Sequence, residues 1–210
     1  MNFRKAQISD ISFIIQCIIE SEKSNSNVFP YFSLFGIDEI AFHRLISDIF
    51  DEDIEDQPWY LGNWYICEVD NLPAAGCCAW VESIHGVSSD MLKSQILSML
   101  LGEKFQNNLP LLQQVSKISL SRKPGTVQLE HLFTTPSHRG LGCMKRLLDF
   151  VGTEFSEKHQ EIQLLQNNLV ALEFYKKIGF NVVDTQCNPE ILRLNLLGDS
   201  CKVKMARIFK

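Results

Sequence analysis

Apolar residues near the start of the chain recur at helical spacing. Residues 3–6 suit a short strand, and Ser9 or Asp10 then supplies a polar residue of the kind that begins helices. Isoleucines follow every three or four positions until the polar run at 21–27, which predicts an amphipathic helix. Residues 36–50 repeat this spacing and predict a second helix. Its inward face is expected to hold Ile40, Leu45, Ile46 and Ile49.

Runs of β-branched and aromatic residues mark the strands that follow. Residues 64–69 and 74–81 are joined by Asp-Asn-Leu-Pro and predict a hairpin. Further strands are predicted at 127–134, 161–166, 180–184 and 201–209, and further helices at 88–101, 107–118, 144–155 and 168–179. This order is that of a mixed α/β protein, with a strand–helix–strand–helix–strand unit in its second half.

The composition fits one ordinary globular domain. The chain has 210 residues, of which 45% are hydrophobic and 21% charged, and its net charge is −5. We therefore expect a single domain over residues 1–210. The acidic balance and the lack of a Lys/Arg run predict no nucleic-acid partner. No apolar run approaches the ~18 residues that cross a bilayer, and no signal-peptide cleavage site follows the first segment, so no membrane partner is expected.

Seven cysteines raise the question of disulfides and metal sites. Their number is odd, no Cys-x-x-Cys spacing occurs, and the neighbours Cys77 and Cys78 would point to opposite faces of a strand. We therefore expect neither a disulfide framework nor a metal site. Free thiols are the rule in a reducing compartment, so the sequence favours a cytoplasmic protein.

A glycine-containing turn lies between the strand predicted at 127–134 and the helix that follows. It contains Arg139, Gly140 and Gly142. The N-terminus of a helix exposes unpaired N–H groups and the positive end of the helix dipole, and glycines let an anion approach the backbone. Arg139 adds a guanidinium suited to phosphate oxygens. The turn therefore predicts a phosphate site, although turns of this composition also occur without any ligand.

Two motifs on these elements resemble the GNAT superfamily of N-acetyltransferases. Residues 129–148 are similar to its motif A, Q/R-x-x-G-x-G/A, with Arg139 first, Gly142 fourth and Met144 sixth, where the family prefers Gly or Ala. Residues 167–180 are similar to motif B, N-x-x-A-x-x-F/L-Y-x-K-x-G-F. The motif B matches are Asn168, Ala171, Phe174, Tyr175, Lys177, Gly179 and Phe180. The opening strand and helix and the hairpin also resemble the family.

The resemblance implies a mixed central sheet of about six to seven strands flanked by helices, in which a splayed pair of strands holds acetyl-CoA. Residues 86–125 would be a helical insertion between the third and fourth strands. The pyrophosphate would rest on the glycine turn, and the pantetheine arm on the strand before it. The residues implied in cofactor binding are Leu132, Phe133, Thr134, Arg139, Gly140, Leu141, Gly142, Cys143, Met144, Lys145, Asn168, Phe174 and Tyr175.

Acetyl transfer to an amine needs groups that move protons. A lysine-like amine with a pKa near ~10.4 is almost entirely protonated at neutral pH, and a departing thiolate benefits from an acid. The resemblance places Tyr175 near the thioester sulfur as that acid and makes Glu130 the candidate base. His131 and ordered water are alternatives for the base. A covalent route through Cys143 is an alternative to direct transfer.

The implied activity is direct transfer from acetyl-CoA to an amine of a small molecule or protein in a ternary complex. The aromatic residues at 27–35 can line an acceptor pocket or belong to the core, and residues 86–125 can shape that pocket or a homodimer contact. One alternative keeps the fold without catalysis, as a coenzyme A-binding regulatory or interaction protein. Another is a domain that binds a different phosphorylated ligand on the same turn.

Overall fold

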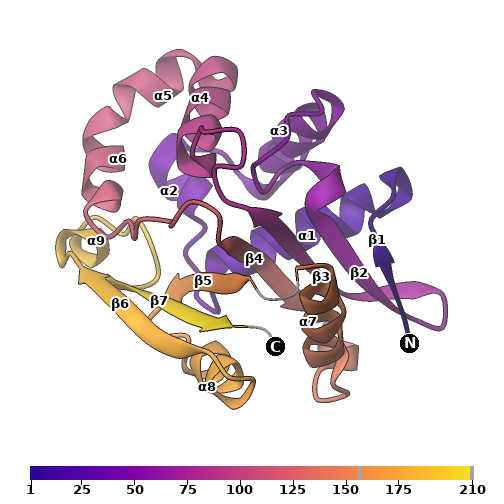
Figure 1. Ribbon diagram of the computed structural model, residues 1–210. Coiled ribbons are helices and arrows are strands. Elements are labelled where there is room, and N and C mark those ends of the chain that lie inside the picture. The colour runs from indigo at the N-terminus through magenta and orange to yellow at the C-terminus, as the bar shows by residue number, and fades with distance from the viewer. Residues whose placement is uncertain (156–157, 209–210) are drawn as a thin grey trace.

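A single sheet organises the molecule. In the computed structural model, which describes residues 1–155 and 158–208, seven strands are arranged in the order β1-β2-β3-β4-β5-β7-β6 (Figure 1). β4 and β5 run parallel, and the other neighbouring pairs are antiparallel. Residue 209, predicted to end the last strand, lies outside the described residues. The strands are β1 (Asn2–Lys5), β2 (Trp64–Val69), β3 (Leu72–Val81), β4 (Val127–Thr134), β5 (His159–Leu165), β6 (Asn181–Cys187) and β7 (Cys201–Ile208).

Helices cover both faces of this sheet. α7 (Cys143–Glu154) and α8 (Leu169–Lys177) pack on one face, and α1 (Ile11–Lys23) packs on the other with the remaining helices. α4 to α6 lie between β3 and β4 in the sequence and form the upper part of Figure 1. Among the described helices, none is long and apolar enough to span a bilayer. The remaining helices are α2 (Pro30–Phe35), α3 (Glu39–Asp51), α4 (Ser89–Leu101), α5 (Glu103–Asn107), α6 (Leu109–Ser116) and α9 (Glu190–Arg193).

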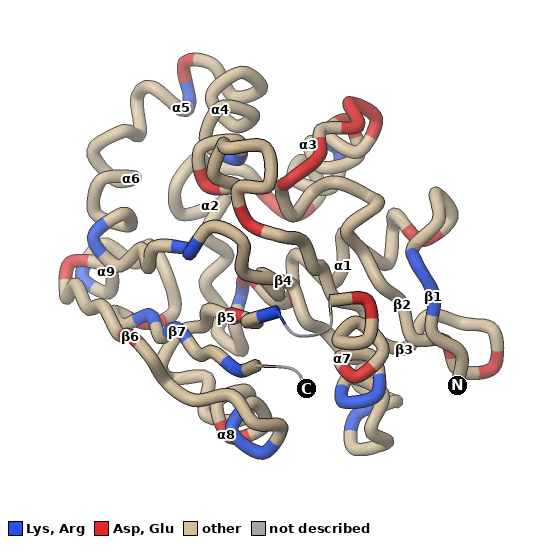
Figure 2. The backbone as a smooth tube through the Cα atoms, viewed as in Figure 1, with Lys and Arg blue, Asp and Glu red and all other residues tan. Residues whose placement is uncertain are grey.

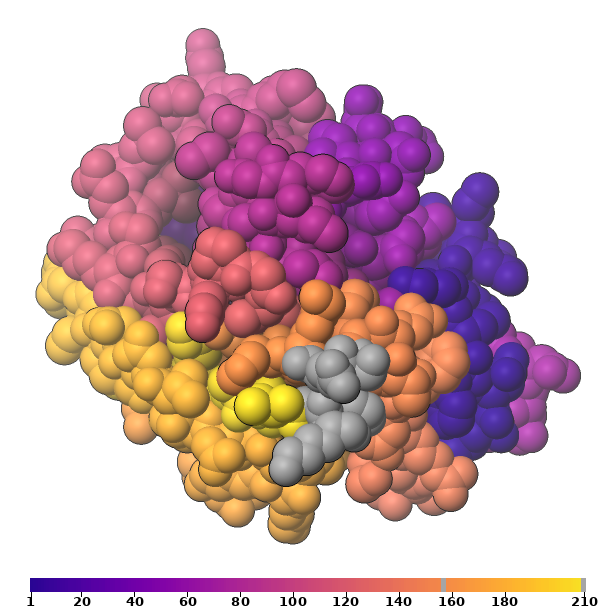
Figure 3. Space-filling view, viewed as in Figure 1, coloured from indigo at the N-terminus to yellow at the C-terminus, as the bar shows by residue number. Residues whose placement is uncertain are grey.

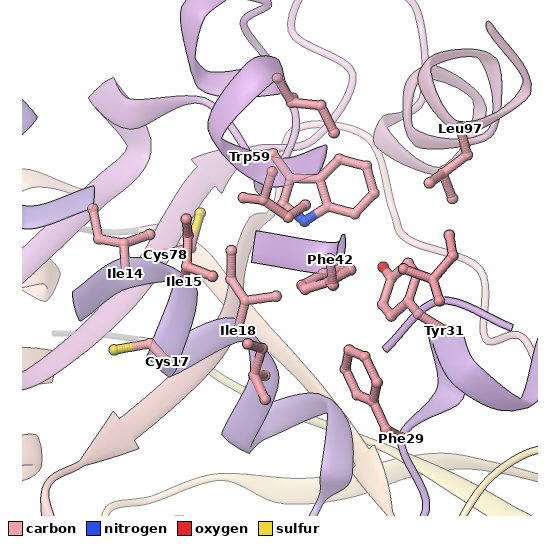
Figure 4. Close-up of a cluster of buried hydrophobic side chains, with 14 of the residues drawn as sticks. Ile14, Ile15, Cys17, Ile18, Phe29, Tyr31, Phe42, Trp59, Cys78 and Leu97 are labelled. Atoms are coloured by element: carbon pink, nitrogen blue, oxygen red, sulfur yellow. The ribbon is translucent and has the colours of Figure 1, made fainter. Parts of the chain in front are cut away.

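The alternation of side chains along the strands divides the core into two layers. Trp64 in β2 packs in the layer with α1, whereas its neighbour Tyr65 packs in the layer with α7. Aromatic rings fill much of the α1 layer (Figure 4). The ring centroid of Phe42 lies 4.3 Å from that of Tyr31 and 5.2 Å from that of Phe29. The sequence allowed Phe29 and Tyr31 to line an acceptor pocket or to belong to the core. The structure shows that they are core residues.

The helices on the α1 face differ from the sequence prediction in several details, and the short helices α5 and α9 were not predicted. Residues 30–35 form α2, which the apolar pattern did not predict because a helix of six residues is too short to show a period. The inward face of α3 is formed around Phe42 and Ile46. Ile40 was also expected on that face, but it is 69% exposed, so this expectation is wrong.

A disulfide joins Cys187, at the end of β6, to Cys201, at the start of β7. The two cysteines lie directly opposite each other in the antiparallel register, with Cα atoms 4.1 Å apart. The expectation that every cysteine is a free thiol is therefore wrong for this pair. Parity and spacing could not reveal it because the pairing depends on the register of two strands that a loop with α9 separates. The free cysteines are Cys17, Cys67, Cys77, Cys78 and Cys143, all of them buried.

Removing this disulfide is expected to destabilise the protein. Closing a loop of 14 residues restricts the unfolded chain, which corresponds to about 3 kcal/mol in the loop-entropy model. The double variant Cys187→Ser/Cys201→Ser should therefore unfold at a lower urea concentration. Dithiothreitol should lower the stability of the unaltered protein and leave that of the variant unchanged. Seven reactive thiols in the unfolded but unreduced protein would contradict the pairing.

Candidate functional site

Two glycines hold the turn between β4 and α7 in the left-handed region of backbone space. Gly140 has a φ of +78° and Gly142 a φ of +80°, values that residues with a Cβ atom rarely adopt. A Cβ atom built on either glycine would meet nothing within 4 Å, so the space beside the backbone is open. Gly142 is also the N-cap of α7. The turn thus offers bare main chain at the start of a helix.

Six consecutive N–H groups of this turn, at residues 140–145, have no acceptor within the described part of the chain. The first helical hydrogen bond of α7 runs from the N–H of Arg146 to the carbonyl of Gly142, 3.1 Å away, and these residues precede it. Arg139 donates from Nε to the carbonyl of Thr134 at 3.3 Å. Basic residues at this end of α7 are blue in Figure 2. Free donors, a helix dipole and basic side chains together favour an anion here.

The side chains of residues 141–145 do not cover the N–H groups of the turn. Cys143 is buried in the layer beneath α7, and Met144 packs against the same layer. The Nζ atom of Lys145 lies 2.7 Å from the carboxylate of Asp149, one helical turn further on. Leu141 is exposed. Met144 therefore occupies the sixth position of motif A with its side chain in contact with the core.

β4 and β5 pair over three residues and then separate. Residues 127–129 of β4 pair with residues 160–162 of β5, after which β4 continues beside β3 and β5 continues beside β7. Within the described residues, the β5-facing edge of β4 has no strand partner from 130 to 134. A free edge of this kind accepts an extended chain as an added strand. The predicted splayed pair of strands is therefore present, and it opens next to the glycine turn.

A bulge lies in β4 at the point where it leaves β5. His131 has a φ of +53°, and residues 131 and 132 together oppose Cys77 of β3. The extra residue resets the alternation of side chains, so Glu130 and His131 both contact groups on the α1 face. Regular alternation would send these neighbours to opposite faces. A β-bulge was the alternative to regular alternation, and the structure contains this bulge.

Glu130 belongs to a charge network between β4 and α4. Its carboxylate pairs with Arg122, which also pairs with Asp90 in α4. Burial raises the pKa of Glu130, but Arg122, followed by His131 and Lys93, outweighs burial and holds the pKa at about 2. Glu130 is therefore ionised throughout the neutral range and has low basicity, which weakens it as a proton acceptor. Its assignment as the base stays a prediction.

His131 is enclosed by side chains from three elements. Its Nδ1 atom lies 2.8 Å from Oγ of Ser21 in α1, and its ring stacks on Trp64 of β2 with centroids 5.9 Å apart. The Nε2 atom lies 3.8 Å from a carboxylate oxygen of Glu130. Burial lowers the pKa of His131 below its ordinary value of 6.5, so the imidazole is neutral at pH 7.

Tyr175 lies in α8, on the other side of the sheet from Glu130. Its ring packs edge-on against Phe174 and Phe180, with centroids 5.4 Å and 5.9 Å away. Burial raises its pKa above the ordinary range, and proximity to the Cys77 thiol adds to the increase. Because Cys77 opposes the bulge in β4, Tyr175 lies close to the same point of the sheet that Glu130 and His131 occupy on the α1 face.

Asn168 caps α8, as its position before the helix predicts. Its Oδ1 atom accepts from the N–H of Ala171 at 3.3 Å, and its Nδ2 atom donates to Oγ of Ser24, just after α1, at 3.4 Å. Cofactor contact by Asn168 stays a prediction. One face of α8 borders a shallow depression with a volume of about 510 Å³, which is lined by Leu169, Val170, Glu173, Phe174 and Lys177.

Sequence reasoning missed the partners of the two β4 residues. Ser21 in α1 and Lys93 in α4 are far from β4 in the sequence, and only the packing of these helices brings them to it. Arg122 lies in the irregular segment just before β4, which shows no pattern that would predict its pairing. No local spacing signals such a network. In the described part of the chain, His, Cys, Asp and Glu side chains form no group of three that could hold a metal ion.

Part of the chain is similar to a known family in sequence, and the whole chain is similar to solved proteins in fold. A model described as an acetyltransferase (GNAT) domain matches residues 112–182. No curated protein matches the sequence. Among solved structures, an N-acetyltransferase from Staphylococcus aureus has a TM-score of 0.67 at 16% identity, over 99% of this chain and 100% of that one.

Two further structures share the fold at low identity. A ribosomal-protein-alanine N-acetyltransferase from Brucella melitensis has a TM-score of 0.54 at 11% identity, over 99% of each chain. An agmatine N-acetyltransferase has a TM-score of 0.57 at 10% identity, over 98% of each chain. The segment matched by the family model contains β4, the glycine turn and α8. Residues 112–182 thus match the GNAT acetyltransferase domain in sequence, and the whole chain shares the fold of these N-acetyltransferase structures.

Proposed function

We propose that this protein moves an acetyl group from acetyl-CoA to an amine by direct transfer in a ternary complex. The proposal is supported by two stretches of main chain without backbone hydrogen-bond partners among the described residues, which lie next to each other where β4 and β5 separate. They are the N–H groups of residues 140–145 and the β5-facing edge of β4. Both lie beside the bulge at which Glu130, His131 and Tyr175 gather. A reacting thioester at that point would have groups for proton transfer on both faces of the sheet.

The open cradle suits the diphosphate of acetyl-CoA. Its oxygens need several N–H donors in a small space, and the bare backbone of Gly140 and Gly142 lets them approach. Arg139, whose side chain is exposed, adds charge at the end of β4. The backbone of Leu132 to Thr134 would hold the pantetheine arm in the manner of an added strand. Bound in this way, acetyl-CoA supplies an activated acetyl group at the bulge.

Tyr175 is suited to the role of the acid in this proposal. Its raised pKa keeps the phenol protonated at neutral pH, so it can donate a hydrogen bond or a proton to a departing thiolate. Glu130 remains ionised beside Arg122 and would act on a cationic amine chiefly through its charge. The aromatic neighbours of Tyr175 limit the positions its hydroxyl can take.

The acceptor would approach from the α1 face, which the cofactor leaves free. A recess opens between α4 and α6 in the space-filling view (Figure 3), and these helices belong to the inserted segment. The acceptor is an amine of a small molecule or of a protein, and acetyl-CoA supply places the reaction in the cytoplasm. Spermidine, agmatine and a peptide with an N-terminal alanine are suitable probes of both acceptor classes.

The first test is a calorimetric titration of the ligand-free protein with acetyl-CoA, with adenosine diphosphate as the control. We expect one-to-one binding of acetyl-CoA that is at least tenfold tighter than that of the control, because the β4 edge holds the pantetheine arm (about 1.4 kcal/mol per factor of ten). Mass spectrometry should then detect acetylation of at least one probe amine. Equal affinities would favour a site for another phosphorylated ligand, and binding without transfer would favour a non-catalytic protein.

The second test replaces Tyr175 with Phe. We expect kcat to fall about 10²-fold, because an acid is lost, while the dissociation constant for acetyl-CoA stays unchanged. Tyr60, which lies in the segment after α3 and bonds to Glu55, offers the matched control Tyr60→Phe, for which kcat should not change. An unchanged kcat in Tyr175→Phe would remove Tyr175 from the mechanism.

A further inference from the structure

We propose that His131 is the general base of this reaction. Ser21 fixes the imidazole tautomer in which Nε2 is free to accept a proton. This inference rests on the proposed acetyl transfer and adds a catalytic residue to it. It also gives Glu130 a different task, which is to stabilise the protonated imidazole. The tautomer of His131 depends on the hydrogen bonds of one hydroxyl group in α1.

Ser21 determines which nitrogen of His131 carries the proton. The hydroxyl of Ser21 donates to the carbonyl of Ile18, one turn earlier in α1, at 2.9 Å. A serine hydroxyl has a single proton, so while it donates to Ile18 its oxygen accepts from the histidine nitrogen that lies 2.8 Å away. Nδ1 of His131 is therefore the N–H donor. In the neutral ring, Nε2 then holds the free lone pair.

This lone pair has no hydrogen-bond partner within the described residues. Nε2 is one of the buried side-chain atoms without a partner, and only 5% of the His131 side chain is exposed. The nearest carboxylate oxygen of Glu130 is 3.8 Å away, which is too far for a hydrogen bond. Trp64 stacks on the ring at an interplanar angle of 6° and restricts its rotation. An acceptor that is buried, oriented and unpaired is unusual, because leaving it so costs stability.

The charges around the ring keep it neutral but able to bind a proton. Burial and the cations of Lys93 and Arg122 disfavour the imidazolium, whereas Glu130 and Glu22 favour it. The outcome is a pKa below 6.5, much closer to neutrality than that of Glu130 at about 2. General bases act best when their pKa lies near the working pH. His131 therefore suits this role better than its neighbour.

The bulge places His131 where the reaction needs a base. The left-handed backbone conformation of His131 directs its imidazole to the α1 face of the sheet, whereas Tyr175 and Cys77 lie on the other face. In the proposed step, the acceptor ammonium gives a proton to Nε2, directly or through one water, and its nitrogen attacks the thioester carbon. The C–S bond then breaks, and the thiolate takes a proton from Tyr175. The attacking nitrogen loses its second proton to solvent, and the tyrosinate takes one back from solvent, so that the amide is neutral and the phenol is restored. The imidazolium faces Glu130 until it returns its proton to solvent.

The tautomer can be read without any activity. In the ¹⁵N-histidine-labelled protein, two-dimensional NMR distinguishes protonated from unprotonated ring nitrogens, and comparison with His131→Gln assigns the signals. We expect Nδ1 of His131 to be protonated and Nε2 unprotonated. In Ser21→Ala, which removes the acceptor for Nδ1–H, the Nε2–H form should gain population. The Nε2–H tautomer in the unaltered protein would overturn the inference.

Kinetics test the role itself. In the unaltered protein, kcat with saturating acetyl-CoA and probe amine should fall as pH drops through the lowered pKa of His131. In His131→Gln, kcat should be about 10²-fold lower and this decline should vanish, while acetyl-CoA affinity confirms that the variant is folded. His43→Gln, on the exposed side of α3, is the matched control.

The outcomes separate this inference from the proposed function. If the unaltered protein acetylates a probe amine and His131→Gln does so with the same pH profile, only the assignment of the base fails. If Glu130→Gln alone removes the decline at low pH, the base is Glu130. If the unaltered protein transfers no acetyl group to any probe, the proposed function fails and the assignment of the base with it.

Discussion

The extra residue at His131 is the constraint on which the arrangement of this site depends. A regular β4 would stay paired with β5 along its length, and its edge would have no room for another chain. The bulge ends that pairing after three residues and leaves the second half of β4 to β3 alone. It also turns two consecutive polar side chains toward α1. One backbone irregularity thus leaves an unpaired strand edge on one side and groups the ionisable residues on the other.

The inserted segment 86–125 supplies the charged partners that stabilise the polar side chains of β4. Glu130 lies in a buried position that an unpaired carboxylate could not occupy at low cost, and Arg122 neutralises it. Asp90 holds the same guanidinium from the start of α4. These helices are therefore part of the site as well as a cover for the core. The inserted segment places the cations of Lys93 and Arg122 beside both Glu130 and His131.

Much of the fold could be predicted from the sequence because its signals are local. The isoleucine period of α1, the runs of β2 and β3, and the glycines before α7 each depend on a few neighbouring residues. The two motifs resemble the GNAT superfamily, and a model of the GNAT acetyltransferase domain matches residues 112–182. The cap formed by Asn168 also followed from its position.

The features that could not be predicted all depend on contacts between distant segments. The Cys187–Cys201 disulfide requires the register of β6 and β7. The exposure of Ile40 depends on how α3 is rotated against α1. The pairing of His131 with Ser21 requires the packing of α1 on the sheet. Neither periodicity nor spacing carries that information.

Amide hydrogen exchange with and without acetyl-CoA tests the central claim most directly, because that claim concerns unpaired main chain. The account predicts slower exchange in peptides that cover residues 130–135 and 139–146 when acetyl-CoA is bound. Peptides from the acidic end of α3, red in Figure 2, should exchange at the same rate with and without it. Saturated binding that leaves both cradle peptides unprotected would contradict the account.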